Sequence, residues 1–247
     1  MMYINKYEHI SKFYEVCLPG FWLPFKRLFE SNIDKGKQYR LIDLGCGTGD
    51  ALEYLNEYIL HYIGVDHSQG MLDIGKQKFK NYDFIQGDIT NFVEPNSKKY
   101  DIVLSAADTV NHLLDKELWD RFFKTAFRLL EDDGILIFDV CTVNDHKNNW
   151  VNYVEIIEND NFTWIRKGEY DADSKIANTH NYFYSLAGDQ NYYKKEYDLI
   201  RQISFEIEEI IQMLRRNNFT DISVYDLHTG LPVDFKTSVA TFFCYIN

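Results

Sequence analysis

The chain has 247 residues, of which 45% are hydrophobic, so it is long enough and apolar enough for one α/β domain with an elaboration. Its formal net charge of −12 argues against a broad surface for nucleic acid or for an anionic membrane. Apolar runs are shorter than the roughly 18 residues of a membrane-spanning helix, and the N-terminus is polar, unlike a secretory signal. We therefore expect a cytoplasmic protein with no metal site, whose four scattered cysteines are reduced thiols.

Residues 3–35 are expected to be helical and rich in aromatic side chains. Large side chains recur there at steps of three and four residues, at Tyr3, Tyr7, Ile10 and Tyr14. Pro19-Gly20 interrupts the pattern, and Phe21 to Phe29 resumes it. Periodicity favours a helix packed against the core; a lid that carries Tyr14 over a ligand is the alternative.

The segment from Leu41 to Asp50, LIDLGCGTGD, predicts a buried strand that turns sharply into a helix. Its glycines tolerate positive φ and let a ligand approach the backbone closely. The following helix offers unpaired N–H groups and the positive end of its dipole to such a ligand. This turn is the first candidate binding site in the chain.

Strand and helix patterns alternate from residue 40 to residue 141. After the glycine turn we expect helices at 51–60, 71–79 and 118–130. Strands are expected at 62–65, 83–86, within 99–108 and at 135–141, with EDDG as a turn before the last of them. This alternation is typical of a parallel, doubly wound α/β sheet.

The pattern then changes to dense β-formers separated by turn signals, which predicts antiparallel strands inserted at 146–204. A helix at 205–217 and strands at 222–227 and 238–246 close the chain. We therefore expect a single domain with a doubly wound, mostly parallel, seven-stranded Rossmann-like sheet and an inserted antiparallel β-sheet. Its parts are an N-terminal helical lid (1–35), the Rossmann-like core (36–145 and 205–247) and the insert (146–204).

Acidic residues occur at three places near the ends of predicted strands. Asp43 lies within the first strand, Asp66 ends the second about 20 residues after the first glycine, and Asp88 follows the third. Ligands of open α/β sheets bind beyond the carboxyl ends of the strands. A carboxylate at Asp66 suits a ribose diol, because it accepts hydrogen bonds from both hydroxyls. Alone, each acid would be a helix cap or a surface charge; together they favour a ligand site.

The glycine spacing separates two classes of cofactor. A dinucleotide site requires G-x-G-x-x-G, which seats a pyrophosphate against a helix N-terminus. Here Gly45, Gly47 and Gly49 form G-x-G-x-G, and Asp50 occupies the position of the last dinucleotide glycine. An anionic side chain there disfavours a diphosphate, so a nucleoside with a zwitterionic tail fits better than NAD or FAD.

These motifs resemble those of the class I S-adenosylmethionine-dependent methyltransferases. The resemblance rests on DLGCGTG, VDHS, QGDI, DIVLSA and LLEDDGILIFDV, which follow one another in the expected order over residues 40–141. It implies S-adenosylmethionine as the cofactor, with Gly45 and Gly47 beside its methionine portion and Asp66 at its ribose. The same resemblance implies further cofactor contacts at Asp88 and Ile89 for the adenine, at the backbone of Ala106 for the methionine ammonium, and at Tyr14, Asp43, Cys46, His67 and Met71.

A narrower resemblance concerns the outer parts of the chain. AADTVNHL, the inserted strands and the segment from YKKEYDL to RRNNF look like the branch that methylates small molecules, which includes amino-sugar N-methyltransferases. In those enzymes a tyrosine and a histidine approach the acceptor, and the matching positions are Tyr14 and His112. An ordinary histidine pKa lies near neutrality, which suits His112 to removing a proton from an amine or a hydroxyl. A locally hydrogen-bonded, structural histidine is the alternative.

We therefore expect a methyltransferase that passes a methyl group to a nitrogen or oxygen of a small-molecule acceptor, as a monomer or homodimer. One alternative is a non-catalytic S-adenosylmethionine-binding module that recognises a partner through the inserted sheet. Another is a nucleotide-dependent oxidoreductase, against which the missing third dinucleotide glycine counts. The many tyrosines of the insert fit an acceptor pocket, a half-buried sheet or a dimer face, and we favour a structural role for most of them.

Overall fold

The computed structural model describes residues 7, 10–12, 20–160, 162–186 and 192–246. Seven of its strands form one sheet, here called sheet A: β1 (Tyr39–Leu44), β2 (Ile59–Asp66), β3 (Asp83–Gln86), β4 (Tyr100–Ser105), β5 (Leu130–Cys141), β10 (Asp221–Asp226) and β11 (Val239–Tyr245). Four strands form a second sheet, sheet B: β6 (Val154–Glu158), β7 (Phe162–Asp171), β8 (Ile176–Leu186) and β9 (Tyr193–Ile203).

Sheet A is mostly parallel, as predicted, and its strand order is β10-β11-β5-β4-β1-β2-β3. Strand β1 pairs in parallel with both β2 and β4, whereas β11 pairs antiparallel with β5 and β10. The chain runs outward from β1 to β3 on one side and then returns to β4 on the other. The carboxyl ends of β1 and β4 therefore flank the point where the strand order reverses, which is where ligands of such sheets bind.

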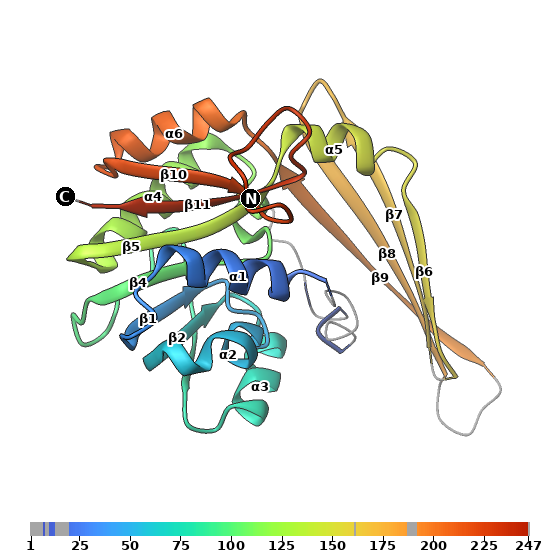
Figure 1. Cartoon of the computed structure of the whole chain (residues 1–247). Helices are drawn as coiled ribbons and strands as arrows, with labels where there is room; N and C mark the ends of the chain where they lie inside the picture. The colour runs from blue at the N-terminus through green and yellow to red at the C-terminus, as the bar shows by residue number, and fades with distance from the viewer. Residues whose placement is uncertain (1–6, 8–9, 13–19, 161, 187–191, 247) are drawn as a thin grey trace.

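Helices cover both faces of sheet A (Figure 1). They are α1 (Trp22–Asn32), α2 (Asp50–Leu55), α3 (Gln69–Lys78), α4 (Lys116–Leu129), α5 (Val143–Asn149) and α6 (Ile207–Arg216), with short 3₁₀ turns η1 (Ile10–Lys12), η3 (Asn56–Tyr58) and η4 (Thr109–His112). Successive residues of β4 point to opposite faces: Val103 packs with the apolar sides of α4 and α6, and Leu104 packs with those of α1 and α2. This alternation produces the three-layer architecture.

Capping side chains mark the first turns of several helices. Ser68 accepts a hydrogen bond from the Met71 N–H at the start of α3, and Asp115 accepts one from the Leu118 N–H at the start of α4. Glu206 and Glu209 form a capping box at the start of α6. These caps satisfy N–H groups that otherwise lack partners in the first helical turn.

Two predicted element boundaries are wrong. The helix expected at 51–60 ends at Leu55, and β2 already begins at Ile59, because Ile59 pairs with Tyr39 at the start of β1. The EDDG segment, expected as a turn, belongs to β5, which begins at Leu130. The register between β4 and β5 shifts across this segment, so the extra residues are accommodated as an irregularity within the strand pair.

Sheet B is an antiparallel meander, as the sequence predicted, and it extends away from the body of the molecule (Figure 1). It lies between α5 and α6 in the chain, and α5 is a helix that the sequence analysis did not predict, since its last residues fall in the segment expected to hold only strands. On its inner side Trp164, Phe183 and Ile200 pack with Ile10 of η1. No helix within the described ranges is both long and apolar enough to cross a bilayer. Cys46, Cys141 and Cys244 are free thiols, and Cys17 lies outside the described residues.

Candidate active site

The glycine turn after β1 is held by the neighbouring strand β2. The N–H groups of Gly45 and Cys46 both donate to the carbonyl oxygen of Val65, at 2.7 and 3.1 Å. Gly45, Gly47 and Gly49 all have positive φ, which is unfavourable for residues with a Cβ. At Gly45 the space is closed as well, since a Cβ there would collide with the side chain of Thr109. Glycine is therefore needed at this position both for conformation and for room.

Asp66, at the end of β2, fixes the turn and faces the space beyond it. Its carboxylate accepts hydrogen bonds from the Gly47 N–H at 2.9 Å and from the Ser68 N–H at 2.8 Å. His67 lies 3.5 Å from the same carboxylate through Nδ1. Each carboxylate oxygen has a second lone pair. The geometry therefore leaves Asp66 able to accept from a ligand hydroxyl while it holds the glycine turn.

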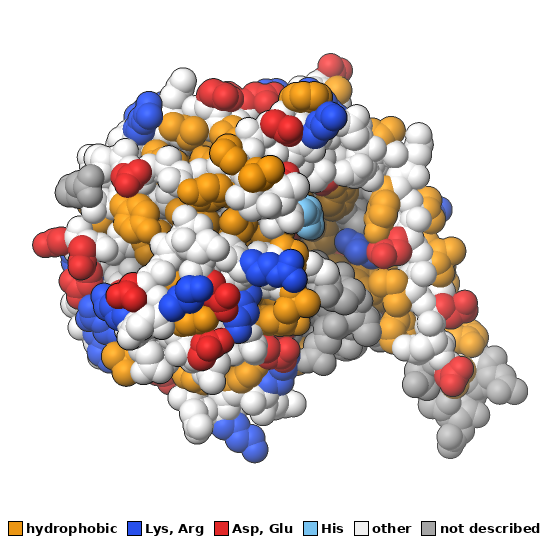
Figure 2. Space-filling view, viewed as in Figure 1, with side chains coloured by type: hydrophobic (Ala, Val, Ile, Leu, Met, Phe, Trp, Pro, Cys, Tyr) orange, Lys and Arg blue, Asp and Glu red, His pale blue; other side chains and the backbone are white. Residues whose placement is uncertain are grey.

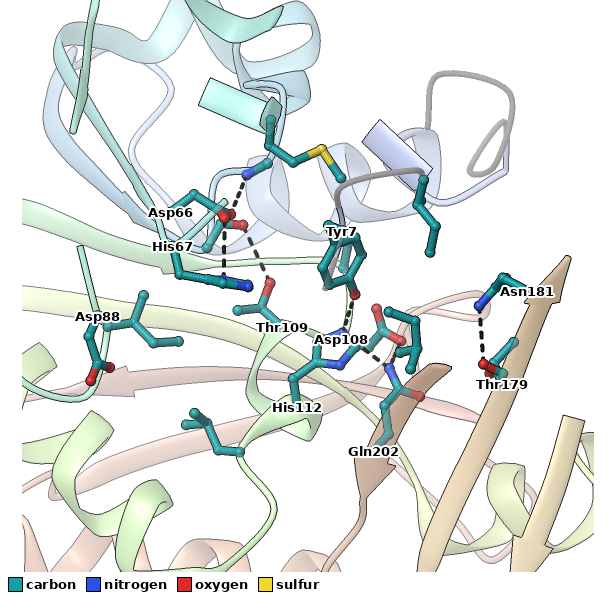
Figure 3. Close-up of a pocket in the computed structure, with 18 of the residues that line it drawn as sticks. Tyr7, Asp66, His67, Asp88, Asp108, Thr109, His112, Thr179, Asn181 and Gln202 are labelled. Carbon is teal, nitrogen blue, oxygen red and sulfur yellow. Dashed lines mark hydrogen bonds and ion pairs between the residues drawn. The ribbon is translucent and has the colours of Figure 1, made fainter. Parts of the chain in front are cut away.

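Asp88, after β3, is arranged in a similar way. Its Oδ1 accepts hydrogen bonds from both the backbone N–H and the hydroxyl of Thr90, each at 2.8 Å. Oδ2 takes part in neither bond and can accept a donor from a ligand. Two carboxylates thus stand at the carboxyl ends of adjacent strands, and Figure 3 shows both on the same side of the Tyr7–His112 pair.

Asp50, the first residue of α2, is partly neutralised. It accepts a hydrogen bond from the Thr48 hydroxyl at 2.7 Å and pairs with the Lys78 ammonium at 3.1 Å. Lys78 also contacts Glu53 at 2.9 Å. The cation in this region is therefore engaged by acidic side chains of α2 and is not among the residues that line the cavity described next.

A cavity of about 280 Å³ lies between the carboxyl edge of sheet A and the inner face of sheet B. Figure 2 shows it as a hollow with apolar side chains on its walls. Predicted site residues that line it are Gly45, Gly47, Asp66, His67, Met71, Asp88, Ile89 and His112. The tertiary structure therefore brings together eight residues that are spread over 68 positions of the chain, between Gly45 and His112.

Three other predicted cofactor residues lie behind the glycine turn. Asp43, Cys46 and Ala106 line a much smaller space of about 20 Å³ that shares Gly45 with the large cavity. Asp43 is buried and accepts a hydrogen bond from the Tyr62 hydroxyl at 3.0 Å, and burial raises its pKa to about 7. The Ala106 carbonyl oxygen accepts from the Thr109 hydroxyl at 2.8 Å. In this structure the three residues line the smaller space and not the large cavity.

His112, the last residue of η4, lies in the middle of the large cavity. The hydroxyl of Tyr7 is 2.8 Å from its Nε2, and the Arg201 carbonyl oxygen is 3.4 Å from its Nδ1. Burial lowers the pKa of His112 to about 4. The near-neutral pKa expected from the residue type is therefore wrong for this environment, in which the ring is neutral at physiological pH.

Sheet B supplies the wall opposite the glycine turn. Its lining residues alternate along three neighbouring strands: Trp164 and Arg166 on β7, Thr179 and Asn181 on β8, and Ile200 and Gln202 on β9. Residues two apart share a face of a strand, so this period groups the residues of each face of sheet B in the sequence but does not say which face lines the cavity. Asn181 accepts from the Trp164 ring N–H at 3.1 Å and donates to the Thr179 carbonyl at 3.1 Å, which fixes the central strand.

Several residues that line the cavity were not predicted from the sequence. Tyr14 lies outside the described residues; Tyr7, seven positions earlier, is the tyrosine that contacts His112. Asp108 and Thr109 were within the AADTVNHL segment but were not singled out. Their position two and three residues beyond the predicted Ala106 was the available signal.

The cavity residues fit S-adenosylmethionine better than a phosphate-bearing cofactor. At the glycine end the lining side chains include the carboxylates Asp66 and Asp88 and the apolar Met71 and Ile89, but no lysine or arginine. Such a set suits ribose hydroxyls and an adenine edge and offers no counter-charge to a diphosphate. The described part of the chain also contains no cluster of three or more His, Cys, Asp or Glu side chains that could hold a metal ion.

Comparisons with known proteins agree with this assignment. Residues 41–134 match the family described as "Methyltransferase domain". A protein of Geobacillus sp. (strain WCH70) named "Putative methyltransferase" is 28% identical over 202 residues, which cover 77% of this chain and 80% of that protein.

Solved structures share the whole fold at low sequence identity. An S-adenosylmethionine-dependent methyltransferase from Clostridium acetobutylicum superposes with a TM-score of 0.83 at 19% identity, covering 98% of this chain and 99% of that chain. The sugar N-methyltransferase KedS8 from Streptoalloteichus sp. superposes with a TM-score of 0.78 at 16% identity, covering 100% of this chain and 95% of that chain.

The sheet order and the glycine turn are those of the α/β fold of a solved S-adenosylmethionine-dependent methyltransferase. Residues 41–134 belong to the methyltransferase domain family, and the whole chain resembles the class I S-adenosylmethionine-dependent methyltransferases, including sugar N-methyltransferases. S-adenosylmethionine is accordingly its cofactor.

Proposed function

We propose that this protein transfers the methyl group of S-adenosylmethionine to a nitrogen or oxygen of a small-molecule acceptor that binds against sheet B. The observation that carries the proposal is one continuous cavity, with Gly47, Asp66 and Asp88 on one side and the side chains of sheet B on the other. A cofactor on the first side and an acceptor on the second would meet near His112.

The chemistry divides simply between cofactor and protein. When bound, S-adenosylmethionine supplies an activated methyl group on a sulfonium, whose leaving group departs as a neutral thioether. The chain's own residues would hold the two reactants in line and exclude water. Asp66 would orient the ribose, and the neutral His112 with its Tyr7 partner would face the acceptor with a fixed hydrogen-bonding pattern.

The lining of the acceptor half of the cavity suits a compact, partly polar molecule. Trp150, Trp164 and Ile200 supply apolar surface, and Thr179, Asn181 and Gln202 supply hydrogen-bonding groups. Small-molecule sites commonly combine apolar walls with a few such polar groups. The resemblance to a sugar N-methyltransferase is consistent with an acceptor of this size and polarity.

Turnover with labelled cofactor tests the proposal. We expect methyl-labelled S-adenosylmethionine to pass its label to at least one member of a panel of amines, amino sugars and hydroxylated metabolites, with one S-adenosylhomocysteine formed per methyl transferred. The matched control is Asp66→Ala, which should bind the cofactor weakly and transfer little. Tight cofactor binding without transfer to any panel member would instead support a non-catalytic binding module, and binding of NADH would support an oxidoreductase.

A further inference from the structure

Asp108 places a carboxylate in the cavity at the end of β4. It follows Ser105, Ala106 and Ala107, and its backbone adopts φ +52, a conformation that Asp and Asn tolerate better than most residues. Its N–H donates to Asp139 Oδ2 at 2.9 Å, which fixes the turn. The side chain lines the cavity.

The contacts of the Asp108 carboxylate are neutral. The amide of Gln202 donates to its Oδ2, and the thiol of Cys141 lies 3.8 Å away. No described residue forms an ion pair with it. The nearby cation, Arg166, pairs instead with Glu155 at 2.9 Å, while Asp145 adds negative charge near the site. A desolvated carboxylate without a counterion is unfavourable, so this site favours a positively charged ligand.

The position of Asp108 assigns it to the acceptor half of the cavity. In Figure 3, Asp66, His67 and Asp88 lie on one side of the Tyr7–His112 pair, and Asp108 and Gln202 lie on the side of sheet B. The next residue, Thr109, contacts the glycine turn through the Gly45 carbonyl at 3.4 Å. The carboxylate thus stands at the boundary between the two halves, where an acceptor atom would meet the methyl group.

Gln202 adds a second acceptor of hydrogen bonds at the same place. It is 2% exposed, and its Oε1 makes no hydrogen bond of standard geometry with a described residue, although the side chain also lies near the ring of His146. Its amide nitrogen is used toward Asp108 and lies 3.5 Å from His112 Nε2. An ammonium ion has three N–H donors and no acceptor, so it matches a carboxylate beside an unsatisfied amide oxygen better than a neutral hydroxyl does.

We propose that the methyl acceptor is an amine that enters as its ammonium ion, and that Asp108 binds the nitrogen and removes its proton. This rests on the methyl transfer proposed above and names its acceptor atom. The Asp108 carboxylate takes one proton from the ammonium, which leaves a neutral amine with a lone pair. That pair forms the N–C bond to the methyl carbon as the C–S bond breaks, and the C–S electron pair remains on sulfur as a neutral thioether. The product is an N-methylammonium ion, and the carboxyl proton passes to solvent.

The ionisation state of Asp108 is consistent with this role. Burial raises its pKa to about 6, against which hydrogen bonding by Gln202 and the charge of Arg166 act. The group is therefore ionised above pH 7, when it can bind a cation, and it is a better proton acceptor than an ordinary aspartate.

A test that requires no knowledge of the acceptor uses sinefungin, the cofactor analogue in which an amino-substituted carbon replaces the methylsulfonium. Its ammonium group occupies the place of the transferable methyl group and so faces the acceptor side. Calorimetry would compare sinefungin, S-adenosylhomocysteine and S-adenosylmethionine on the wild-type protein, on Asp108→Asn and on the control Asp120→Asn. Asp120 lies on α4, where its side chain contacts Asn217, and does not line the cavity.

We expect Asp108→Asn to weaken sinefungin binding at least tenfold and S-adenosylhomocysteine binding less than twofold, with Asp120→Asn neutral toward both. Asparagine keeps the shape and tolerates the backbone conformation, and retained S-adenosylhomocysteine affinity reports that the variant is folded. Equal changes for sinefungin and S-adenosylhomocysteine would overturn the proposal. A loss for S-adenosylmethionine as large as that for sinefungin would also overturn it, because Asp108 would then pair with the cofactor's own charge.

Matched acceptors provide a second arm. Each amine of the panel would be assayed beside the compound in which a hydroxyl replaces the amino group. We expect the wild-type protein to transfer methyl groups to amines. At pH 8 the rate of this transfer should be at least 100-fold lower in Asp108→Asn. Preferential transfer to the hydroxyl compounds would contradict the proposal. Absence of transfer to every compound would count against the methyltransferase function itself, whereas the sinefungin result addresses Asp108 alone.

Discussion

The hydroxyl of Tyr7 lies 2.8 Å from Nε2 of His112, joining the N-terminal segment to the loop after β4 across 105 positions of sequence. On the other side of the ring, Nδ1 faces the Arg201 carbonyl oxygen at 3.4 Å. A carbonyl oxygen only accepts, so Nδ1 carries the proton and Nε2 accepts from Tyr7. The ring of His112 is thereby held as one neutral tautomer between the two halves of the cavity.

His112 should remain neutral throughout the physiological pH range. Burial lowers its pKa to about 4, because the charged ring is poorly solvated there. We expect its ring resonances in a proton NMR titration to show no transition between pH 6 and 8, with the assignment made by their loss in His112→Gln. A transition near pH 6.5 would contradict the buried, neutral state and restore the role of a conventional base.

Replacing Tyr7 by phenylalanine should remove one part-buried hydrogen bond. We expect Tyr7→Phe to lower the free energy of unfolding by about 0.5–1.5 kcal/mol and to reduce turnover, with little change in cofactor affinity. Tyr197→Phe is the matched control, since the Tyr197 hydroxyl also lies 2.8 Å from a histidine ring nitrogen, that of His180, but in an exposed position outside the cavity. Equal turnover in the two variants would show that the Tyr7 contact is only structural.

Asp66→Ala should weaken S-adenosylmethionine binding roughly tenfold or more, in line with 1.5–3 kcal/mol for a hydrogen bond to a charged group. The substitution also removes the acceptor of the Gly47 N–H, so both ribose binding and the glycine turn are affected. Asp226→Ala is the control, because Asp226 likewise accepts backbone N–H groups in a turn but does not line the cavity. An unchanged dissociation constant in Asp66→Ala, measured by calorimetry, would remove Asp66 from the cofactor site.

The glycine at position 45 should be required for two separable reasons. Alanine there would adopt a left-handed conformation, unfavourable by about 1–2 kcal/mol, and its Cβ would collide with Thr109. We expect Gly45→Ala to destabilise the fold and to impair cofactor binding. Thr109→Ala should relieve the collision but not the backbone strain. The loss of unfolding free energy in the double variant Gly45→Ala/Thr109→Ala should therefore be smaller than the sum of the losses in the two single variants. Strict additivity in denaturant unfolding would show that the side chains do not interact.

Asp139 should make the protein less stable as the pH rises. It is buried, its Oδ1 has no partner among the described residues, and burial raises its pKa to about 8, above that of an unfolded aspartate. Between these pKa values the native state holds one proton more than the unfolded state, so the free energy of unfolding falls with rising pH.

Denaturant unfolding between pH 6.5 and 7.5 would measure this effect. The buried histidines His112 and His146, whose pKa values are lowered to about 4, are then neutral in the native state, and in the unfolded state they lose their remaining protons across this range. Their contribution to the slope is the same in wild type and variant, so the difference between the two slopes reports Asp139. We expect Asp139→Asn to make the slope less negative by up to about 1.4 kcal/mol per pH unit. The exposed control Asp132→Asn should leave the slope unchanged. A slope identical in wild type and Asp139→Asn would mean that Asp139 is already ionised.

Much of the fold could be predicted because its signals are local. Alternating apolar runs and turn residues indicated the parallel sheet and the insert, and the spacing of Gly45, Gly47 and Gly49 indicated the turn whose positive φ values the structure has. Boundaries were less secure where pairing between strands overrode a local pattern. Ile59 was predicted in a helix but belongs to β2, because it pairs with Tyr39 of β1. The EDDG segment was predicted as a turn but belongs to β5, which pairs with β4.

The sequence by itself determined the succession of strands and helices, the glycine turn, and the carboxylates of Asp66 and Asp88 near the strand ends. Each of these follows from residues that are adjacent in the chain. Only the tertiary structure decided which face of sheet B lines the cavity, that Tyr7 meets His112, and that Asp108 stands beside Gln202 without a counterion. Those contacts depend on how the N-terminal segment and the insert lie against the carboxyl edge of sheet A. Such long-range geometry leaves no trace in the spacing of neighbouring residues.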